Sequence, residues 1–276
     1  MIKTILLSAA TLLFAVSSQA QTQAKSQTKI LKKSLELKMP KTVDDDMPGT
    51  RGAAVVWHPV QKKYYAAFAG NYGYPLAVFD ATGKRLSKDT LITMFDIRGM
   101  WYNPTKKTIQ MNGYNEGGWA EYILDSKGIP TDKEVMFEGM NQPNDQSTGF
   151  YNTRDKFVYF LNDDGNLAKY EGVSAEYEKD ITLNLGKTEE DDEFENADVI
   201  DDYNTAATYT DMPGSEIALL NHYEKKIEIY SLRTGYKVKE FSLPEEATIE
   251  SRFNFSYSNG IYWLFDMKKR TWFGYR

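Results

Sequence analysis

A pattern of β-strands recurs five times along the chain, and it constrains the fold more than any other feature of the sequence. Each repeat has an aromatic-led strand, a polar turn, a strongly apolar strand, a short loop and a third strand. The pattern is clearest where residues 57–63 lead into the apolar segment 64–68, and where residues 102–107 lead into 108–111. The first-strand aromatic residues are Trp57, Tyr102, Tyr151, Tyr209 and Tyr257, at spacings of 45, 49, 58 and 48 residues.

Repeats of roughly 40 to 50 residues with four strands each are typical of propeller blades. We expect second strands at 64–70, 108–113, 157–162, 216–221 and 261–266, and third strands at 76–80, 120–125, 166–171, 226–231 and 271–276. Fourth, outer strands are expected at 89–95, 133–139, 177–185 and 237–243. The sequence therefore predicts an all-β fold, a five-bladed β-propeller of four-stranded blades.

The chain from about Lys29 onward resembles β-propeller repeat proteins, particularly in the segment 78–84, which reads Val-Phe-Asp-Ala-Thr-Gly-Lys. The Gly-His and Trp-Asp signatures of WD40 repeats and the Ser-x-Asp-x-Gly box of sialidases are absent. The resemblance thus implies an architecture and no narrower family. Because this architecture serves both enzymes and binding modules, it does not fix the activity.

The fifth repeat ends at Arg276 after three strands, whereas residues 29–38 form an unpaired strand candidate before the first repeat. Pairing 29–38 with 271–276 would close the ring and hide two sheet edges. Six blades would require strands within 186–202, but residues 188–195 are acidic and poor in strand formers. A β-sandwich or two stacked β domains is the other alternative.

The N-terminal 20 residues are typical of an export signal. Lys3 precedes the apolar stretch 5–16, and 18–20 read Ser-Gln-Ala, a small-x-small cleavage site. Residues 21–28 are polar and interpreted as a disordered leader, followed by a single propeller domain at 29–276 with an acidic insert at 186–203. The chain has no cysteine, hence no disulfide, thiolate metal site or lipid-anchoring thiol. We expect an exported protein, either periplasmic or secreted.

A propeller sorts its loops onto two ends. Turns between first and second strands and between third and fourth strands form one end, here called the basic end; they carry Lys62, Lys63, Lys84, Arg85, Lys106, Lys107, Lys127, Arg154, Lys156 and Arg233. The other end, here called the acidic face, contains the loops that lead into each blade and those between second and third strands. Its acids are Asp44, Asp45, Asp46, Asp96, Asp145, Asp163, Asp164, Asp201, Asp202 and Glu250.

Aromatic and arginine side chains accompany the acids of the acidic face, and such side chains suit carbohydrate or peptide recognition. We predict ligand binding by Tyr72, Tyr74, Tyr114, Trp119, Tyr223, Arg51, Arg98 and Arg252. The expected function is an exported binding or interaction module for a glycan, a peptide or a protein partner. The alternative is a glycoside hydrolase using a carboxylate pair among Asp46, Asp96, Asp145, Asp202 and Glu250. A structural role through the outer blade edges is the third possibility.

Other chemistries lack support in the sequence. The net charge of −6 argues against nucleic acid as a partner. No apolar stretch approaches the roughly 20 residues of a membrane span. The turn 162–166 resembles a calcium loop in composition but lacks its terminal glutamate. The two histidines, His58 and His222, have no nucleophile motif beside them. We assign no catalytic residue, no metal and no cofactor, and expect a monomer that is not membrane-embedded.

Overall fold

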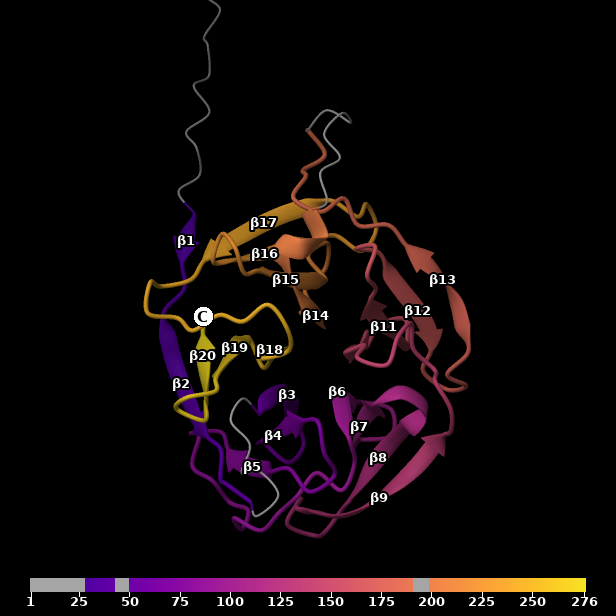
Figure 1. The fold of residues 1–276 in the computed structure, drawn as a ribbon, viewed down its shortest axis with the longest axis vertical. Coiled ribbons are helices and arrows are strands. Elements are labelled where there is room, and N and C mark those ends of the chain that lie inside the picture. Colours follow the sequence, from indigo (N-terminus) through magenta and orange to yellow (C-terminus); the bar gives the residue numbers. More distant parts are fainter. Residues whose placement is uncertain (1–27, 43–49, 191–198) are drawn as a thin grey trace, which may run out of the picture.

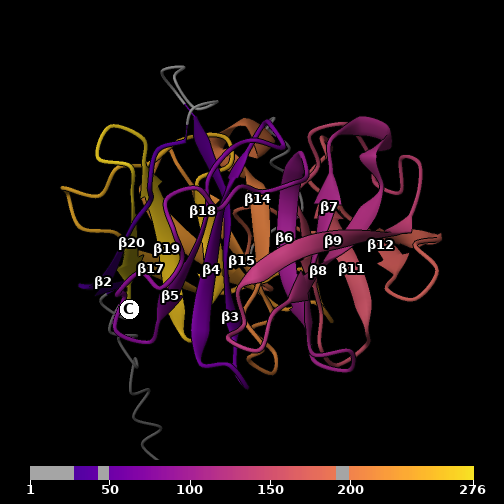
Figure 2. The ribbon, with the colours of Figure 1, turned by 90° about the horizontal axis from the view of Figure 1, so that it is seen from below.

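Five small sheets surround a central axis in the computed structural model, which describes residues 28–42, 50–190 and 199–276 (Figure 1). Their strands run roughly along that axis when the ring is seen from the side (Figure 2). The protein is a five-bladed β-propeller, so the fold predicted from the repeat is confirmed. The expected export signal at 1–20 and the leader up to residue 27 lie outside the described residues.

Each blade is an antiparallel sheet whose first strand lies innermost. Blade one contains β3 (Arg51–His58), β4 (Lys63–Ala69) and β5 (Leu76–Asp80). Blade two contains β6 (Ile97–Asn103), β7 (Thr108–Gly113), β8 (Trp119–Leu124) and β9 (Pro130–Phe137), with a 3-10 turn η1 at Asn115–Gly117. Blade three contains β10 (Gly149–Tyr151), β11 (Phe157–Leu161), β12 (Leu167–Glu171) and β13 (Tyr177–Ile181). Blade four follows η2 (Val199–Asp202) and contains β14 (Tyr203–Tyr209), β15 (Ile217–Asn221), β16 (Lys226–Tyr230) and β17 (Lys237–Ser242). Blade five contains β18 (Phe255–Ser258), β19 (Ile261–Asp266) and β20 (Thr271–Tyr275).

The N-terminal segment closes the ring, as the strand count predicts. Strand β2 (Lys33–Lys38) pairs antiparallel with β20 and becomes the fourth strand of blade five. The segment also contacts blade four, which the sequence did not indicate. The two-residue strand β1 (Lys29–Ile30) pairs in parallel with β17, so one continuous segment joins the outer edges of blades four and five (Figure 1).

Blade one differs from the others at its outer edge. In place of a regular fourth strand at 89–95, the segment 85–92 lies against β5 through two isolated bridges, Phe79 with Arg85 and Pro75 with Ile92. Between these bridges, the backbone N–H groups of Leu86 and Ser87 both donate to the carbonyl of Val78. Backbone groups at this edge of β5 therefore form hydrogen bonds without a continuous fourth strand.

Strand alternation explains how the blades hold together. Val55 belongs to an apolar cluster shared with blade five, whereas its neighbours Ala54 and Val56 belong to a cluster shared with blade two. Successive side chains of a strand point to opposite faces, so each blade packs against both neighbours. The five apolar clusters found among the described residues correspond to the five blade-to-blade interfaces.

The inner strands approach each other most closely toward the acidic face. A methyl group built on Gly99 would overlap the backbone of Gly149 and the side-chain oxygen of Asn112. Buried asparagines connect neighbouring blades here: Asn112 Oδ1 accepts the Gly149 N–H at 3.0 Å, and Asn254 Oδ1 accepts the Gly52 N–H at 2.6 Å. The ring is thus tied together at this end by backbone contact and amide hydrogen bonds.

The described residues contain no helix long and apolar enough to span a membrane. The helical elements found in them are the two short 3-10 turns, η1 and η2.

The variant Gly99→Ala should be destabilised by about 1–3 kcal/mol, because the added methyl group must push apart two backbones in a well-packed interior. Gly117→Ala is the control, since a methyl group there meets only the Phe95 ring at an ordinary 3.9 Å. Urea unfolding followed by fluorescence measures both. Equal stability of the two variants would contradict the close approach of blades two and three.

Candidate functional site

A cavity of about 580 Å³ occupies the central axis, within the range of small-ligand sites. Its wall comes from all five inner strands and from the turns that follow them, including Pro59, Pro104, Thr153, Asp211 and Asn259. Several of these turn residues are exposed, whereas the deeper wall contains small residues such as Ala53, Gly99 and Gly149. The cavity therefore opens at the basic end and narrows toward the acidic face.

The wall near the opening contains the five aromatic residues that define the sequence repeat. They are Trp57, Tyr102, Tyr151, Tyr209 and Tyr257, one from each blade. Each also packs in the interface with the preceding blade; Trp57, for example, joins the cluster between blades five and one. Tyr151 and Tyr209 are buried, whereas Trp57, Tyr102 and Tyr257 are partly exposed. The rings are thus held rigidly by packing in the blade interfaces, and all five residues contribute to the wall of the cavity.

In blades one to four, the residue after the aromatic side chain stabilises the turn at the opening. Asn103 Oδ1 accepts the N–H groups of Thr105 and Lys106, at 3.0 and 3.1 Å. Asn152 Oδ1 accepts the Arg154 N–H at 3.0 Å. His58 in blade one and Thr210 in blade four accept turn N–H groups in the same way. These side chains substitute for backbone acceptors in the turn.

His58 links the turns of blades one and two beside the opening. Its Nδ1 accepts the Gln61 N–H at 3.2 Å, so the proton must lie on Nε2, which is 3.1 Å from the carbonyl oxygen of Lys107. The ring lies 4.7 Å from that of Tyr102, a residue of the cavity wall. Burial is the main cause that lowers the pKa of His58, which keeps the imidazole neutral.

Asp211 is the one carboxylate in the described cavity wall. Its Oδ1 accepts hydrogen bonds from Thr153 Oγ1 at 3.2 Å and from the Tyr209 hydroxyl at 3.3 Å, and lies 3.4 Å from Arg154 Nε. Burial is the main cause that raises the pKa of Tyr209 to about 12. Tyr209 therefore stays protonated and remains a donor to Asp211. Thr208, Ser256 and Ser258 are further polar residues of the wall. The Ser256 hydroxyl bonds to the backbone of Val55, and the Ser258 hydroxyl accepts the Trp263 indole N–H at 3.1 Å.

Arg98 and Tyr114, two of the residues predicted to bind a ligand, contact each other on the acidic face. Arg98 is the extra residue of a β-bulge between Ile97 and Gly99. It is 5% exposed, forms an ion pair with Asp96, donates to Gln146 Oε1 at 2.8 Å, and lies 4.6 Å from the Tyr114 ring. Its guanidinium is thus engaged within the protein.

The other predicted ligand-binding residues are separate from the cavity. Tyr72, Tyr223, Arg51 and Arg252 are exposed on loops or a strand end of the acidic face, and Tyr74 is partly exposed there. Trp119 is buried between blades two and three, where its indole N–H donates to the Asn141 carbonyl at 3.2 Å. None of the eight predicted residues belongs to the cavity wall as described.

The acids considered for hydrolysis do not meet in the cavity either. Asp96 pairs with Arg98, and Asp145, Asp202 and Glu250 are absent from the described wall, while Asp46 lies outside the described residues. The described chain contains no group of three or more His, Asp or Glu side chains arranged for a metal ion. In the turn 162–166, Asn162 and Asp164 both accept the N–H of Asn166, which is ordinary turn bonding.

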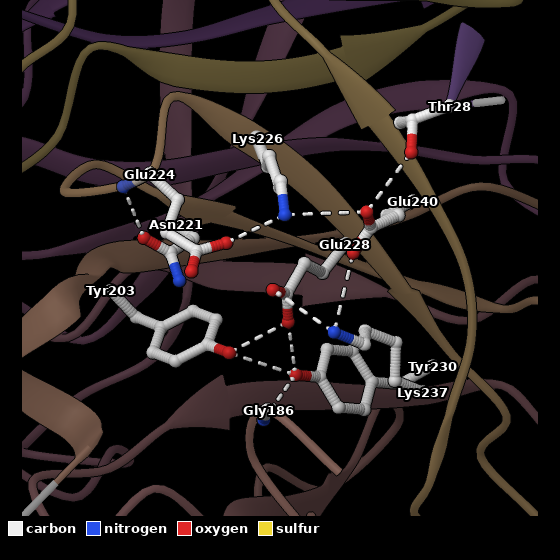
Figure 3. Close-up of polar contacts among 10 residues, drawn as sticks. All are labelled: Thr28, Gly186, Tyr203, Asn221, Glu224, Lys226, Glu228, Tyr230, Lys237 and Glu240. Atoms are coloured by element: carbon white, nitrogen blue, oxygen red, sulfur yellow. Dashed lines mark hydrogen bonds and ion pairs between the residues drawn. The ribbon is translucent and has the colours of Figure 1, made fainter. Parts of the chain in front are cut away.

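A second polar cluster lies inside blade four, around Glu228 on β16 (Figure 3). Glu228 is 1% exposed, and its Oε2 accepts hydrogen bonds of 2.6 Å from the hydroxyls of Tyr203 and Tyr230. Lys237 Nζ lies 3.5 Å from the other carboxylate oxygen. The Tyr230 hydroxyl also accepts the Gly186 N–H at 2.9 Å. The cluster therefore ties both ends of the connection between blades three and four, Gly186 and Tyr203, to the centre of blade four.

Comparison with known proteins supports the fold and leaves the family open. No family model and no curated protein sequence matches the chain. A crystal structure of glutaminyl cyclase from Myxococcus xanthus is similar with a TM-score of 0.55 and 8% identity, covering 90% of this chain and 96% of that one. An auxiliary nutrient binding protein from Bacteroides thetaiotaomicron aligns at a TM-score of 0.49 and 11% identity, over 91% of this chain and 77% of that one. At such identities the first likeness shows the fold alone.

The cavity residues were missed by sequence reasoning, although a signal for them exists. The five aromatic residues occupy one register in the repeat, next to the turn that follows each inner strand. Residues in one register of a ring must lie at one height around its axis, so their clustering could have been predicted. Asp211 has a weaker signal in the sequence. It occupies the same position as the corresponding turn residues of the other blades, but none of those residues is acidic.

The stability of the protein should fall as the pH drops below about 6.5, the ordinary pKa of histidine. The folded state lowers the pKa of His58, so the unfolded chain takes up the proton first and unfolding becomes easier in acid. His58→Asn, chosen because Asn103 and Asn152 occupy the same turn position, should flatten this slope, and His222→Asn should keep it. Melting temperatures between pH 8 and 5.5 test this; an unchanged slope in His58→Asn would contradict it.

Tyr230→Phe should cost about 1–3 kcal/mol of stability, because it leaves the buried carboxylate of Glu228 with one hydrogen-bond donor fewer and removes the acceptor of the Gly186 N–H. Tyr262→Phe is a matched control: within the described chain its buried hydroxyl has no hydrogen-bond partner, so its loss should be neutral or stabilising. Chemical unfolding measures both changes. An equal loss of stability in Tyr262→Phe and Tyr230→Phe would contradict the prediction.

Proposed function

We propose that the protein is an exported binding module whose central cavity takes one compact organic ligand, of the size of a sugar or an amino acid unit. The observation that carries the proposal is the set of five aromatic residues in the wall of an open 580 Å³ cavity. The signal-like composition of the segment 1–20 supports a location outside the cytoplasm.

The composition of the wall favours binding over hydrolysis. Aromatic surfaces beside hydroxyl groups suit ligands with both apolar faces and polar edges, and rings fixed by packing need little ordering when a ligand binds. Carboxylate-dependent glycoside hydrolysis requires two acids flanking one bond. The described wall provides Asp211 alone, which is already hydrogen-bonded. The glutaminyl cyclase shares the fold alone, so its activity is not transferred to this chain.

The cavity also suits a ligand better than the acidic face does. Arg98 on that face is already paired, and Trp119 is buried. Tyr72 and Tyr223 are well exposed but extend from different blades. A cavity collects several contacts around one small molecule, whereas separate exposed rings do not. A role of the acidic face in contacting a larger partner remains a separate proposal.

A screen of mono- and disaccharides and of dipeptides by thermal shift should reveal a ligand, because saturation at about 100 times Kd adds roughly 2.7 kcal/mol. For the best ligand, Tyr102→Leu and Tyr257→Leu should weaken binding about two- to tenfold, since leucine fills the blade interface but offers no aromatic face. Tyr72→Leu and Tyr223→Leu on the acidic face are the matched controls. Weaker binding in the controls alone would move the site to the acidic face.

A further inference from the structure

The proposed cavity has one polar corner, formed where the turn of blade four meets the inner strand of blade five. Asp211 stands at this corner with a φ of 61°, the left-handed conformation, beside Tyr209. Tyr257 of blade five lies in the same wall and is partly exposed. The corner therefore combines a carboxylate with two aromatic rings at the opening of the cavity.

The contacts of the Asp211 carboxylate involve one of its two oxygens, so the other can accept a hydrogen bond from a ligand. Thr153, Tyr209 and Arg154 all approach Oδ1, and the contacts found among the described residues leave Oδ2 without a partner. The side chain of Asp211 is 65% exposed. Oδ2 is therefore a free acceptor at the opening of the cavity.

Arg154 is the cation that competes with a ligand for this carboxylate, but it is not part of the cavity wall. At Tyr209 the two charges oppose each other: Asp211 raises the pKa of the phenol and Arg154 lowers it, both after the dominant effects of burial and the Thr153 hydrogen bond. At Tyr257, after burial, Asp211 alone among the charged groups raises the pKa. The charge of Asp211 therefore acts on Tyr257 of blade five as well as on Tyr209.

We propose that the corner formed by Asp211, Tyr209 and Tyr257 is a subsite for an ammonium group, so that the ligand of the cavity carries a cationic amine. The inference rests on the proposed function of the cavity. An exposed ion pair alone changes affinity by no more than about fivefold. The faces of tyrosine rings add attraction for the same cation, and this combination recognises ammonium ligands in aromatic cages.

The lysines of the basic end do not reverse this preference inside the cavity. Lys62, Lys107 and Lys156 are exposed in the turns of blades one to three, and none of them belongs to the wall as described. Solvent and salt weaken the field of such exposed charges. These lysines form an outer border, whereas Asp211 belongs to the wall itself.

Two matched sets of probes test the charge preference and separate two sources of the amine. Glucosamine is compared with glucose, and phenylalanine amide with N-acetylphenylalanine amide, by calorimetric titration at pH 6.5 and low salt; N-acetylphenylalanine adds an anionic probe. In at least one set, the ammonium probe should bind about three- to tenfold more tightly than its neutral partner. The set that shows the preference identifies an amino sugar or an amino-terminal unit as the source.

Asp211→Asn should abolish this preference, so that each ammonium probe binds no more tightly than its neutral partner. Asparagine tolerates the left-handed conformation and retains Oδ1, so the turn should fold. Glu216→Gln is the control, because it removes another acidic neighbour of Arg154, 3.9 Å away, that does not belong to the wall. It should keep the preference.

Three results would overturn the proposal: equal binding of ammonium and neutral probes, tighter binding of the anionic probe, or a preference that survives Asp211→Asn. Absence of binding by every probe would overturn it as well. The proposed function is judged separately, by the effect of Tyr102→Leu on the affinity of whichever neutral sugar or peptide binds. A cavity that binds neutral ligands without charge preference would thus lose the ammonium subsite and keep its function.

Discussion

Packing between neighbouring blades is the interaction on which the rest of the structure depends. The inner strand of blade one shows how it works, with Val55 and Trp57 facing blade five and Ala54 and Val56 facing blade two. A twisted sheet with two apolar faces cannot bury both by itself, so each blade needs two neighbours. The same requirement makes ring closure necessary, and β2 meets it by covering the edge of β20 and placing Leu37 in the interface with blade one.

The architecture could be predicted from the sequence because it rests on period-2 patterning that recurs at regular spacing. The pairing of 29–38 with the last strand followed from counting strands, and the register of β2 with β20 confirms it for Lys33–Lys38. Residues Lys29 and Ile30 pair with β17 of blade four instead. Local details could not be predicted in this way. The strand β1 has only two residues, and its pairing depends on where β17 lies. The segment 85–92 pairs with the edge of blade one through two isolated bridges, so its sequence shows no alternating pattern.

The position of the cavity could not be predicted, because it depends on how closely backbones approach. The loop pattern correctly distinguishes two ends, but nothing in it shows which end is wider. The acidic-face end is narrowed by the contact between Gly99 and Gly149 and by the amides of Asn112 and Asn254. Glycine and asparagine are also common in ordinary turns. Their role in drawing the blades together is evident only when the strands are placed in three dimensions.

The aromatic residues of the repeat connect the stability of the ring with the proposed binding of a ligand. Tyr102 packs in the cluster between blades one and two and also against His58, so contacts within the protein fix the orientation of its ring. A ring fixed in this way loses little entropy on binding. Asp211 breaks the symmetry, because it places a carboxylate in one of five otherwise uncharged parts of the wall. Packing between the five blades therefore provides a wall with fixed aromatic side chains, and under the proposed function the turn that carries Asp211 would orient a polar ligand within it.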